Sequence, residues 1–390
     1  MDHLIRRSRP LAVPLLASTL SVSCASASAL SASSEVNSSR ADARATDASR
    51  GDATGASRTD ARAEASYADA ADGGPIDVTR AYPAVCNGHA ELCGRSYDRV
   101  AFAGTHGSYA VSSQGFLAPD QTYSVARQLQ DGIRVLHFEL HIYESAVYAC
   151  HSICAIGSLP FADEMTSIAS FVAANPTEVV TMLLERSDST ITADNIGDVI
   201  KASGLEPRMA VQQVGAAWPT LGDMTQGGQT VVALLDDTTG SSKNWLLPRW
   251  QLTWETPWDN TTPMDFGQCE ADRGAMGDGV YVVDTYLEDQ VISTVAHSAL
   301  VNYDPFLLDR FLYCQRATST LPNFAMVNFY EASDIFSVVD VLNGFATAPD
   351  AGLAAFPPDA WPDGGAPGVD GGARLDAGSP SDATADAPHD

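Results

Sequence analysis

The sequence predicts an α/β fold of the (βα)8 TIM-barrel type, and three observations lead to that prediction. Short apolar runs alternate with helix-like stretches, which is the pattern of a largely parallel sheet. Most runs end at a polar or ionisable residue, and in a closed barrel the carboxyl ends of the strands converge on the face that carries the chemistry. Between two low-complexity termini, residues 82–346 supply about 265 residues, a length that suits one barrel or two small domains.

The candidate strands are apolar runs that share one property, an ionisable or amide side chain at or just after the end. They are RVAFAG before His106, GIRVLHFELH ending at His141, AVYAC before His151, EVVTMLLE ending at Glu185, TVVALLDD ending at Asp236 and Asp237, GVYVVDTY with Asp284, and FAMVNFYE with Asn328 and Glu331. Strands usually end at the surface, which accounts for the aspartates. It accounts less well for three histidine-bearing ends in a chain of eight histidines.

Three helix-like stretches lie between these runs, at 124–131, 161–174 and 192–203. Asp163 or Thr192 is suited to cap a helix start, and Asn175 followed by Pro176 is a stop signal. Strands and helices therefore alternate as a βα barrel requires.

Both termini are predicted to lie outside the barrel. Residues 1–30 combine a basic start, a short apolar stretch and small residues, as in an export signal, with cleavage after Ala29 or lipidation of Cys24; a buried N-terminal helix is the alternative. Residues 31–81 and the acidic tail 347–390 have too few large apolar residues to fold and are predicted to be disordered. We expect an exported protein, secreted or lipid-anchored at the cell surface.

The charge of the chain bounds its partners. A net charge of −27 argues against a nucleic-acid partner and against electrostatic attraction to anionic membranes. Peripheral membrane contact through aromatic loops remains open, and core packing is the commoner role of such aromatics. We expect a monomer.

Six cysteines remain once Cys24 is set aside, an even number that predicts disulfides in an exported chain. Sequence proximity favours the pairs Cys86–Cys93, Cys150–Cys154 and Cys269–Cys314, although six cysteines allow about fifteen connectivities. A zinc site on Cys150, His151 and Cys154 is the competing interpretation, and no second pair of ligands at suitable spacing accompanies it.

The run at 132–141 predicts which side chains enter the barrel, because strand side chains alternate between faces. His137, Glu139 and His141 share one face, and the apolar residues between them share the other. Packing the apolar face against helices turns the His-x-Glu-x-His face into the lumen. Arg134 falls on the apolar face, so we expect a structural ion pair near the start of the strand.

The order of these motifs resembles the phosphatidylinositol-specific phospholipase C X-type barrel of the PLC-like phosphodiesterases. The similar segments are GTHGSY, QLQDGIRVLHFEL, ACHS, NPTEVVTMLLE, WPTLGDM and MVNFYEASDIFSVVDVLNG. The opening CNGHAELCGRSYDRV and the Cys-His-x-x-Cys segment are similar to a secreted, cysteine-containing branch. The resemblance spans 84–346 and implies a phosphodiesterase-type barrel.

The resemblance implies two catalytic histidines. His106 corresponds to the general base, which takes a proton from the substrate's own hydroxyl, and His151 to the general acid for the leaving oxygen. Imidazole suits both roles, since its pKa lies near the working pH. The implied substrate is a phospholipid or small phosphodiester. Two departures weaken the match: Gly107 stands where the family has Asp or Asn, and Asn328 stands where an Asp orients the base.

A third departure concerns positive charge near the phosphate. Glu139 and Glu185 stand where metal-independent relatives carry arginine and lysine, and phosphoryl transfer needs cations around the phosphate oxygens. His137, Glu139 and Glu185 resemble the calcium ligands of metal-dependent members. A divalent metal of undetermined identity is therefore one hypothesis; a hydrogen-bonded network in a barrel of weak or no activity is the other.

Two strand-end acids, Asp236 and Asp284, are candidate contacts for substrate hydroxyls, and caps or turns are their commoner fate. The leading interpretation of the whole chain is a secreted phospholipase C-type phosphodiesterase. The alternatives are an inactive barrel that serves as a cell-surface binding module, and a metal-dependent glycerophosphodiesterase or sphingomyelinase D-like enzyme.

Overall fold

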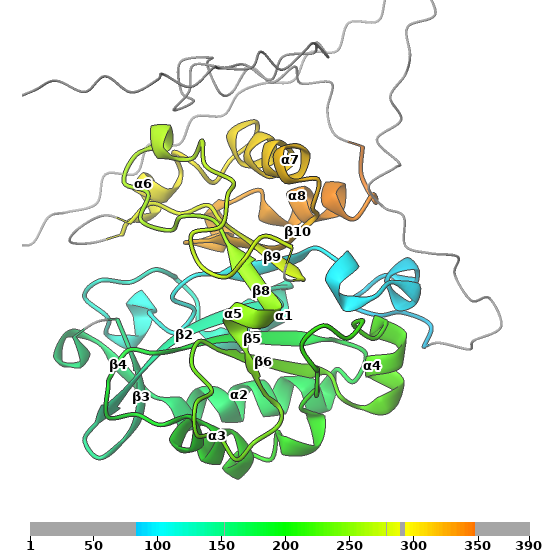
Figure 1. The fold of residues 1–390 in the computed structure, drawn as a ribbon. Coiled ribbons are helices and arrows are strands. Elements are labelled where there is room, and N and C mark those ends of the chain that lie inside the picture. The colour runs from blue at the N-terminus through cyan, green and yellow to red at the C-terminus, as the bar shows by residue number, and fades with distance from the viewer. Residues whose placement is uncertain (1–82, 152, 278, 289–292, 348–390) are drawn as a thin grey trace, which may run out of the picture. The chain divides into compact units, whose positions relative to one another are not determined.

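Eight parallel strands in the described part of the chain follow one another around a curled sheet (Figure 1). They are β1 (Phe102–Thr105), β2 (Val135–Tyr143), β5 (Val180–Arg186), β6 (Val231–Leu235), β7 (Leu246–Pro248), β8 (Thr253–Glu255), β9 (Val280–Asp284) and β10 (Pro322–Val327). Their spatial order is β7-β6-β5-β2-β1-β10-β9-β8. This is the strand order of a (βα)8 barrel, so the predicted α/β, TIM-barrel-like class is confirmed.

The computed structural model describes residues 83–151, 153–277, 279–288 and 293–347. The predicted export signal at 1–30, the linker at 31–81 and the tail from 348 onward lie outside the described residues. No helix within the described ranges is both long enough and apolar enough to span a bilayer.

The barrel has a seam between β7 and β8, two strands that do not pair with each other in the part of the chain described. A single helical turn, α5 (Arg249–Leu252), joins them. The ring of strands is therefore not closed by backbone pairing at this point, although each of these three-residue strands pairs with its other neighbour. Side chains rather than backbone hydrogen bonds are left to bridge the seam.

The run that precedes His151 is not a barrel strand. It forms β3 (Ala146–Cys150), which pairs antiparallel with β2 and with the short β4 (Ser158–Pro160). His151 is therefore carried on a hairpin that extends from the carboxyl end of β2. The prediction that His151 follows a strand of the barrel is wrong. The hairpin nevertheless places His151 at the pocket with the other predicted residues.

Helices cover the outside of the sheet, with α2 and α3 beneath β5 and β6 in Figure 1 and α7 and α8 beside β10. The helices are α1 (Val125–Asp131), α2 (Phe161–Ala174), α3 (Ala193–Ala202), α4 (Leu221–Gly227), α6 (Val295–Ser298), α7 (Phe306–Thr318) and α8 (Ile335–Leu342). Thr192 caps α3 in a reciprocal capping box with Asn195, as expected of a start signal. Asp163 instead lies within the first turn of α2, beyond the cap.

The alternation along β2 divides the molecule into an outer core and a lumen. Leu136, Phe138 and Leu140 are fully buried and belong to the cluster that includes Met165 and Ile168 of α2. Lumen-facing residues nearer the strand starts form a second cluster that contains Val135, Leu183, Val232, Phe324 and Met326. The lower lumen is thus filled by apolar side chains, and polar side chains collect above it.

Three disulfides join the six cysteines of the barrel: Cys86–Cys93, Cys150–Cys154 and Cys269–Cys314. The pairing favoured by sequence proximity is confirmed. A zinc site on Cys150 and Cys154 does not fit, since neither disulfide-bonded sulfur is a thiolate.

Candidate active site

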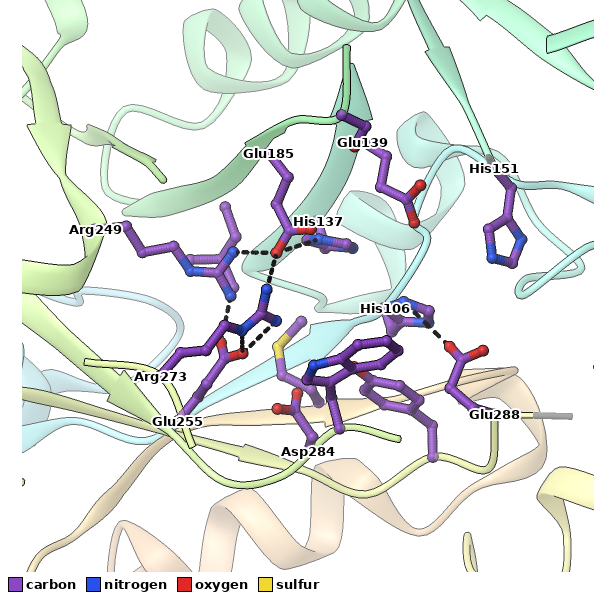
Figure 2. A pocket seen from close by; sticks show the side chains of 15 residues that line it. His106, His137, Glu139, His151, Glu185, Arg249, Glu255, Arg273, Asp284 and Glu288 are labelled. Carbon is purple, nitrogen blue, oxygen red and sulfur yellow. Dashed lines mark hydrogen bonds and ion pairs between the residues drawn. The ribbon is translucent and has the colours of Figure 1, made fainter. Parts of the chain in front are cut away.

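A pocket of about 370 Å³ opens at the carboxyl ends of the strands (Figure 2). Ten of its 15 lining residues are histidine, arginine, aspartate or glutamate. The lining residues are His106, His137, Glu139, His151, Leu183, Glu185, Ser187, Arg249, Glu255, Trp258, Arg273, Asp284, Tyr286, Glu288 and Met326. Both histidines assigned by resemblance, and the three residues predicted to hold a metal, therefore face one cavity.

His106 follows β1 directly and is 6% exposed. Its Nδ1 lies 3.1 Å from the Oδ1 of Asn328, at the end of β10. The Nδ2 of Asn328 donates to Ser293 and Asp120, which fixes the amide so that its oxygen faces the imidazole. An acceptor at Nδ1 places the ring proton there and leaves Nε2, which lies 3.7 Å from Oε1 of Glu288, as the basic nitrogen (Figure 2).

The surroundings of His106 favour the neutral ring. Burial lowers its pKa well below the ordinary value, and the nearby rings of His137 and His151 lower it further. Tyr286 stacks on the imidazole, with ring centroids 4.1 Å apart. These surroundings favour the uncharged form of the His106 ring at near-neutral pH.

His151 is the more exposed of the pair and has the opposite tendency. Its Nδ1 lies 3.5 Å from the Oδ2 of Asp120 and 3.4 Å from the carbonyl oxygen of Ala118. Burial opposes its charged form, but the carboxylates of Asp120, Glu139 and Glu288 outweigh burial and raise its pKa. The ring centroids of His106 and His151 are 6.3 Å apart, with the rings nearly perpendicular.

The opposite side of the pocket is a cluster of two arginines and two glutamates, shown at the left of Figure 2. We call Glu185, Arg249, Glu255 and Arg273 the ion-pair cluster. Arg249 donates to Glu185 at 2.8 Å and to Glu255 at 2.6 Å, and Arg273 donates to the same two carboxylates. Because β5, α5 and β8 supply three of the four residues, the cluster bridges the seam.

Charge balance within the ion-pair cluster favours the ionised forms of Glu185 and Arg273. Burial alone would raise the pKa of Glu185, yet His137, Arg249 and Arg273 hold it well below its usual range. Burial would lower the pKa of Arg273, and the charges of Glu255 and Glu185 raise it instead. Both arginines line the cavity, and the side chain of Arg273 is 34% exposed whereas that of Arg249 is only 3% exposed, so Arg273 is the more accessible cation.

The predicted metal ligands His137, Glu139 and Glu185 do not fit a metal site in this arrangement. His137 accepts the backbone N–H of Gly107 at Nδ1, and its Nε2 lies 3.4 Å from Glu185, so both ring nitrogens are engaged. Glu185 already accepts from two guanidinium groups, which would repel a cation. Across the described residues, no group of three or more His, Cys, Asp or Glu side chains is placed to hold a metal ion.

The other predicted residues divide between the pocket and the frame. Asp284 lines the pocket, where burial and then the charge of Glu255 raise its pKa. Asp236 does not: it accepts the backbone N–H groups of Arg186 and Asp237. Arg134 also lies outside the lining and pairs with Glu178 at 2.7 Å, as its strand face predicted.

Sequence reasoning missed Arg249, Arg273, Glu255, Tyr286 and Glu288. Tyr286 had a readable signal, since it lies two residues after Asp284 and therefore on the same face. Arg249 begins the one-turn helix α5 and Glu255 ends the three-residue strand β8, and elements this short show no apolar periodicity. Their role emerges only when the seam brings them beside Glu185.

Curated proteins with similar sequences include relatives from the fungus Arthroderma benhamiae and the plant Arabidopsis thaliana. The "PI-PLC X domain-containing protein 1" of Arthroderma benhamiae is 27% identical over 288 residues, covering 67% of this chain and 90% of the relative. An "Uncharacterized secreted protein" of the same fungus is 30% identical over 184 residues, or 45% of this chain and 41% of the relative. Among solved structures, the phosphatidylinositol-specific phospholipase C from Listeria monocytogenes superposes with a TM-score of 0.45 at 14% identity, covering 65% of this chain and 95% of that one.

The described barrel also coincides with a known domain. The family model for the PI-PLC X domain matches residues 92–343, which begins in the disulfide-bonded N-terminal segment and ends at the close of α8. That match covers well over half of the 390 residues. A phosphodiesterase-like barrel therefore fills these residues, and the chain belongs to the PI-PLC X domain family.

Proposed function

We propose that this chain is a phosphodiesterase that cleaves phosphatidylinositol or a related phosphodiester with two histidines as general base and general acid. The observation that carries the proposal is that the pKa values of two imidazoles in one pocket are shifted in opposite directions. The pKa of His106 is lowered and that of His151 is raised, with the rings 6.3 Å apart. A neutral ring beside a readily protonated one is the starting state of an acid–base pair.

The proposed step is an internal displacement at phosphorus. Nε2 of His106 takes the proton from a substrate hydroxyl as that oxygen forms its bond to phosphorus. The bond from phosphorus to the leaving oxygen breaks, and His151 gives that oxygen a proton. The products are a cyclic phosphodiester and a free alcohol, and the two histidines have exchanged protonation states. Solvent resets them.

Arg273 supplies positive charge near the phosphate, in place of the hypothesised divalent metal. Its guanidinium is partly exposed to the cavity and is held charged by Glu255 and Glu185. A planar guanidinium is suited to two phosphate oxygens at once. The proposal therefore includes no metal in the chemical step.

The test is a product analysis. The disulfide-bonded chain is incubated with phosphatidylinositol and, separately, with glycerophosphodiesters, with and without EDTA, and the phosphorus-containing products are identified by ³¹P NMR. We expect a cyclic inositol phosphate that forms equally well in EDTA. The matched variants are His106→Ala, which should abolish it, and His89→Ala, which removes an imidazole stacked on Phe345 outside the pocket and should not.

Each other outcome points to a different function. Product released only without EDTA would favour a metal-dependent glycerophosphodiesterase or sphingomyelinase D-like enzyme. No product from any substrate would favour a binding module, to which the departures at Gly107 and Asn328 also point. Equal activity in His106→Ala would remove the base assignment.

We propose that the protein works outside the cell, secreted or lipid-anchored. Three disulfides support an oxidising compartment, and one relative is named as a secreted protein. Mass spectrometry of the exported chain distinguishes the routes: cleavage after Ala29 leaves Leu30 first, whereas anchoring leaves a lipid-modified Cys24.

Peripheral contact with lipid is part of the same proposal. Leu117 is 68% exposed and Ile153 58%, and a backbone hydrogen bond from Leu117 to Ile156 joins their two loops. Ile153 lies two residues beyond His151, so apolar surface flanks the site where a lipid substrate would enter. Ile153→Ser should weaken cosedimentation with phosphatidylcholine vesicles, and unchanged binding would remove this contact.

A further inference from the structure

A buried aspartate, Asp120, lies behind both histidines in a loop that carries no recognisable motif. It is 2% exposed and does not line the pocket. We propose that Asp120 is the positioning carboxylate of His151, and that it occupies the space left by the missing side chain of Gly107. The inference deepens the proposed function and rests on it for its catalytic meaning.

The backbone of Asp120 is fixed at both ends. Its N–H donates to the carbonyl oxygen of Ala110 at 2.8 Å, and its own carbonyl accepts from the N–H of Phe329 at 2.9 Å. The side chain is fixed through Oδ1, which accepts from Asn328 Nδ2 at 3.2 Å. The carboxyl group is therefore held in place by the segments that follow β1 and β10, independently of either histidine.

The second carboxyl oxygen is aimed at the imidazoles. Oδ2 is buried and makes no hydrogen bond within the described residues, and it lies 3.5 Å from Nδ1 of His151 and 3.9 Å from Nδ1 of His106. Burying a carboxylate without a partner is costly, so this oxygen needs a nearby cation or proton. Since Nδ1 of His106 already faces Asn328, His151 is the group that supplies it.

A side chain at position 107 and the carboxyl group of Asp120 cannot occupy this space together. A Cβ built on Gly107 would lie 2.1 Å from Oδ2 of Asp120, a distance that non-bonded atoms do not tolerate. Gly107 also has a φ of +49°, in the left-handed region where glycine is favoured and Asp is among the better-tolerated side chains. One carboxyl group fits in this space, and here it comes from position 120 instead of position 107.

The placement explains how His151 is prepared as an acid. Besides Asp120, the carboxylates of Glu139 and Glu288 raise the pKa of His151, and burial raises the pKa of Asp120 itself to about 8. The carboxyl group and imidazole together thus retain a proton at neutral pH. With Nδ1 facing Asp120 and Ala118, Nε2 is the nitrogen left to protonate the leaving oxygen.

The first test compares the full disulfide-bonded chain with Asp120→Asn, a substitution of nearly equal shape. We expect kcat on phosphatidylinositol to fall about 10²–10⁴-fold, as when the carboxylate behind a catalytic histidine is neutralised. The titration of His151, followed by NMR of its ring Cε1–H, should move to lower pH. Unchanged kcat together with an unchanged titration would overturn the proposal.

The second test moves the carboxylate. Asp120→Ala alone should lose activity, and Gly107→Asp alone should lose it by crowding Asp120. The double variant Gly107→Asp/Asp120→Ala should regain at least about tenfold over Asp120→Ala, since the two singles fail for complementary reasons. A double variant that folds, by circular dichroism, yet is no better than either single contradicts the exchange of positions.

The two tests separate this inference from the proposed function. If the wild-type chain cleaves no phosphodiester, the proposed function fails, and the NMR titration still decides whether Asp120 pairs with His151. If the wild-type chain is active but Asp120→Asn changes neither kcat nor the titration, the proposed function stands and the pairing is refuted.

Discussion

The two sides of the pocket hold their charges in different ways. In the ion-pair cluster, Arg249 contacts Glu185 and Glu255 at 2.8 and 2.6 Å, and every member has an opposite charge beside it. On the other side His106 and His151 meet their neighbours at 3.1 to 3.9 Å, through an amide, a carbonyl, a buried carboxyl group and the partly exposed carboxylate of Glu288. Closely paired charges resist a change of protonation, and loosely paired imidazoles allow one. The first side is suited to hold a frame and a phosphate, and the second to move protons.

The largest expected effect is on the histidine side. His151→Ala should lower kcat by about 10²–10⁴-fold, the usual contribution of a general acid, with little change in the free energy of unfolding. Steady-state kinetics and urea denaturation measure the two quantities. A His151→Ala variant whose free energy of unfolding falls by as much as its activation free energy rises would contradict the contrast between the two sides.

The next effect is structural and lies in the ion-pair cluster. Glu255→Ala should lower the free energy of unfolding by about 3–5 kcal/mol, because it leaves the 3%-exposed Arg249 and its neighbour Arg273 short of a carboxylate. The matched control is Asp237→Ala, which removes a 2.6 Å pair with Arg186 in which Asp237 is 52% exposed. That control should cost less than about 1 kcal/mol in urea denaturation. Equal small losses would show that the cluster does not hold the seam.

Arg273 links the two roles of its cluster. Arg273→Ala should lower kcat/KM for phosphatidylinositol by about 10²-fold, and Arg273→Lys by less, because lysine keeps the charge without the planar fork. Arg127→Ala is the control, since Arg127 is 59% exposed and pairs with Asp131 on α1. An Arg273→Ala variant with wild-type kcat/KM would assign phosphate binding elsewhere.

The smallest expected effect is the dependence of kcat/KM on pH. His106 must be unprotonated and its pKa is lowered, so kcat/KM should rise with pH through a value below 6.5. His151 must be protonated and its pKa is raised, so kcat/KM should fall again through a value above 6.5. A bell-shaped profile that brackets 6.5 is expected. A profile with a single limb would mean that only one imidazole exchanges protons.

Local patterns predicted the frame well. The helix at 161–174 lies where the sequence placed it, Thr192 caps the next helix, and the alternation along β2 separates Leu136 and Phe138 from the lumen. Each rests on neighbours within a few residues, where periodicity and capping chemistry act directly. Sequence proximity also gave the disulfides.

Local patterns could not predict the seam or the ion pairs beside it, because these join residues that are distant in the sequence. Glu185 and Arg273 are 88 residues apart and meet only after the barrel curls. The cations near Glu185 come from other elements, Arg249 from α5 and Arg273 from the loop between β8 and β9, so the residues of β2 and β5 alone do not reveal them. Asp120 was missed for the same reason, since its loop has no period and its importance depends on empty space at Gly107.

The disulfide between Cys150 and Cys154 clasps the short loop from which His151 projects. Protein made in a reducing cytosol would leave both thiols free, and His151, the proposed general acid, would lose this covalent restraint. Reduced protein that showed no activity could not be told apart from a barrel that is inherently inactive. Turnover should therefore be measured on material folded in the periplasm or another oxidising host, with thiol content verified before the assay begins.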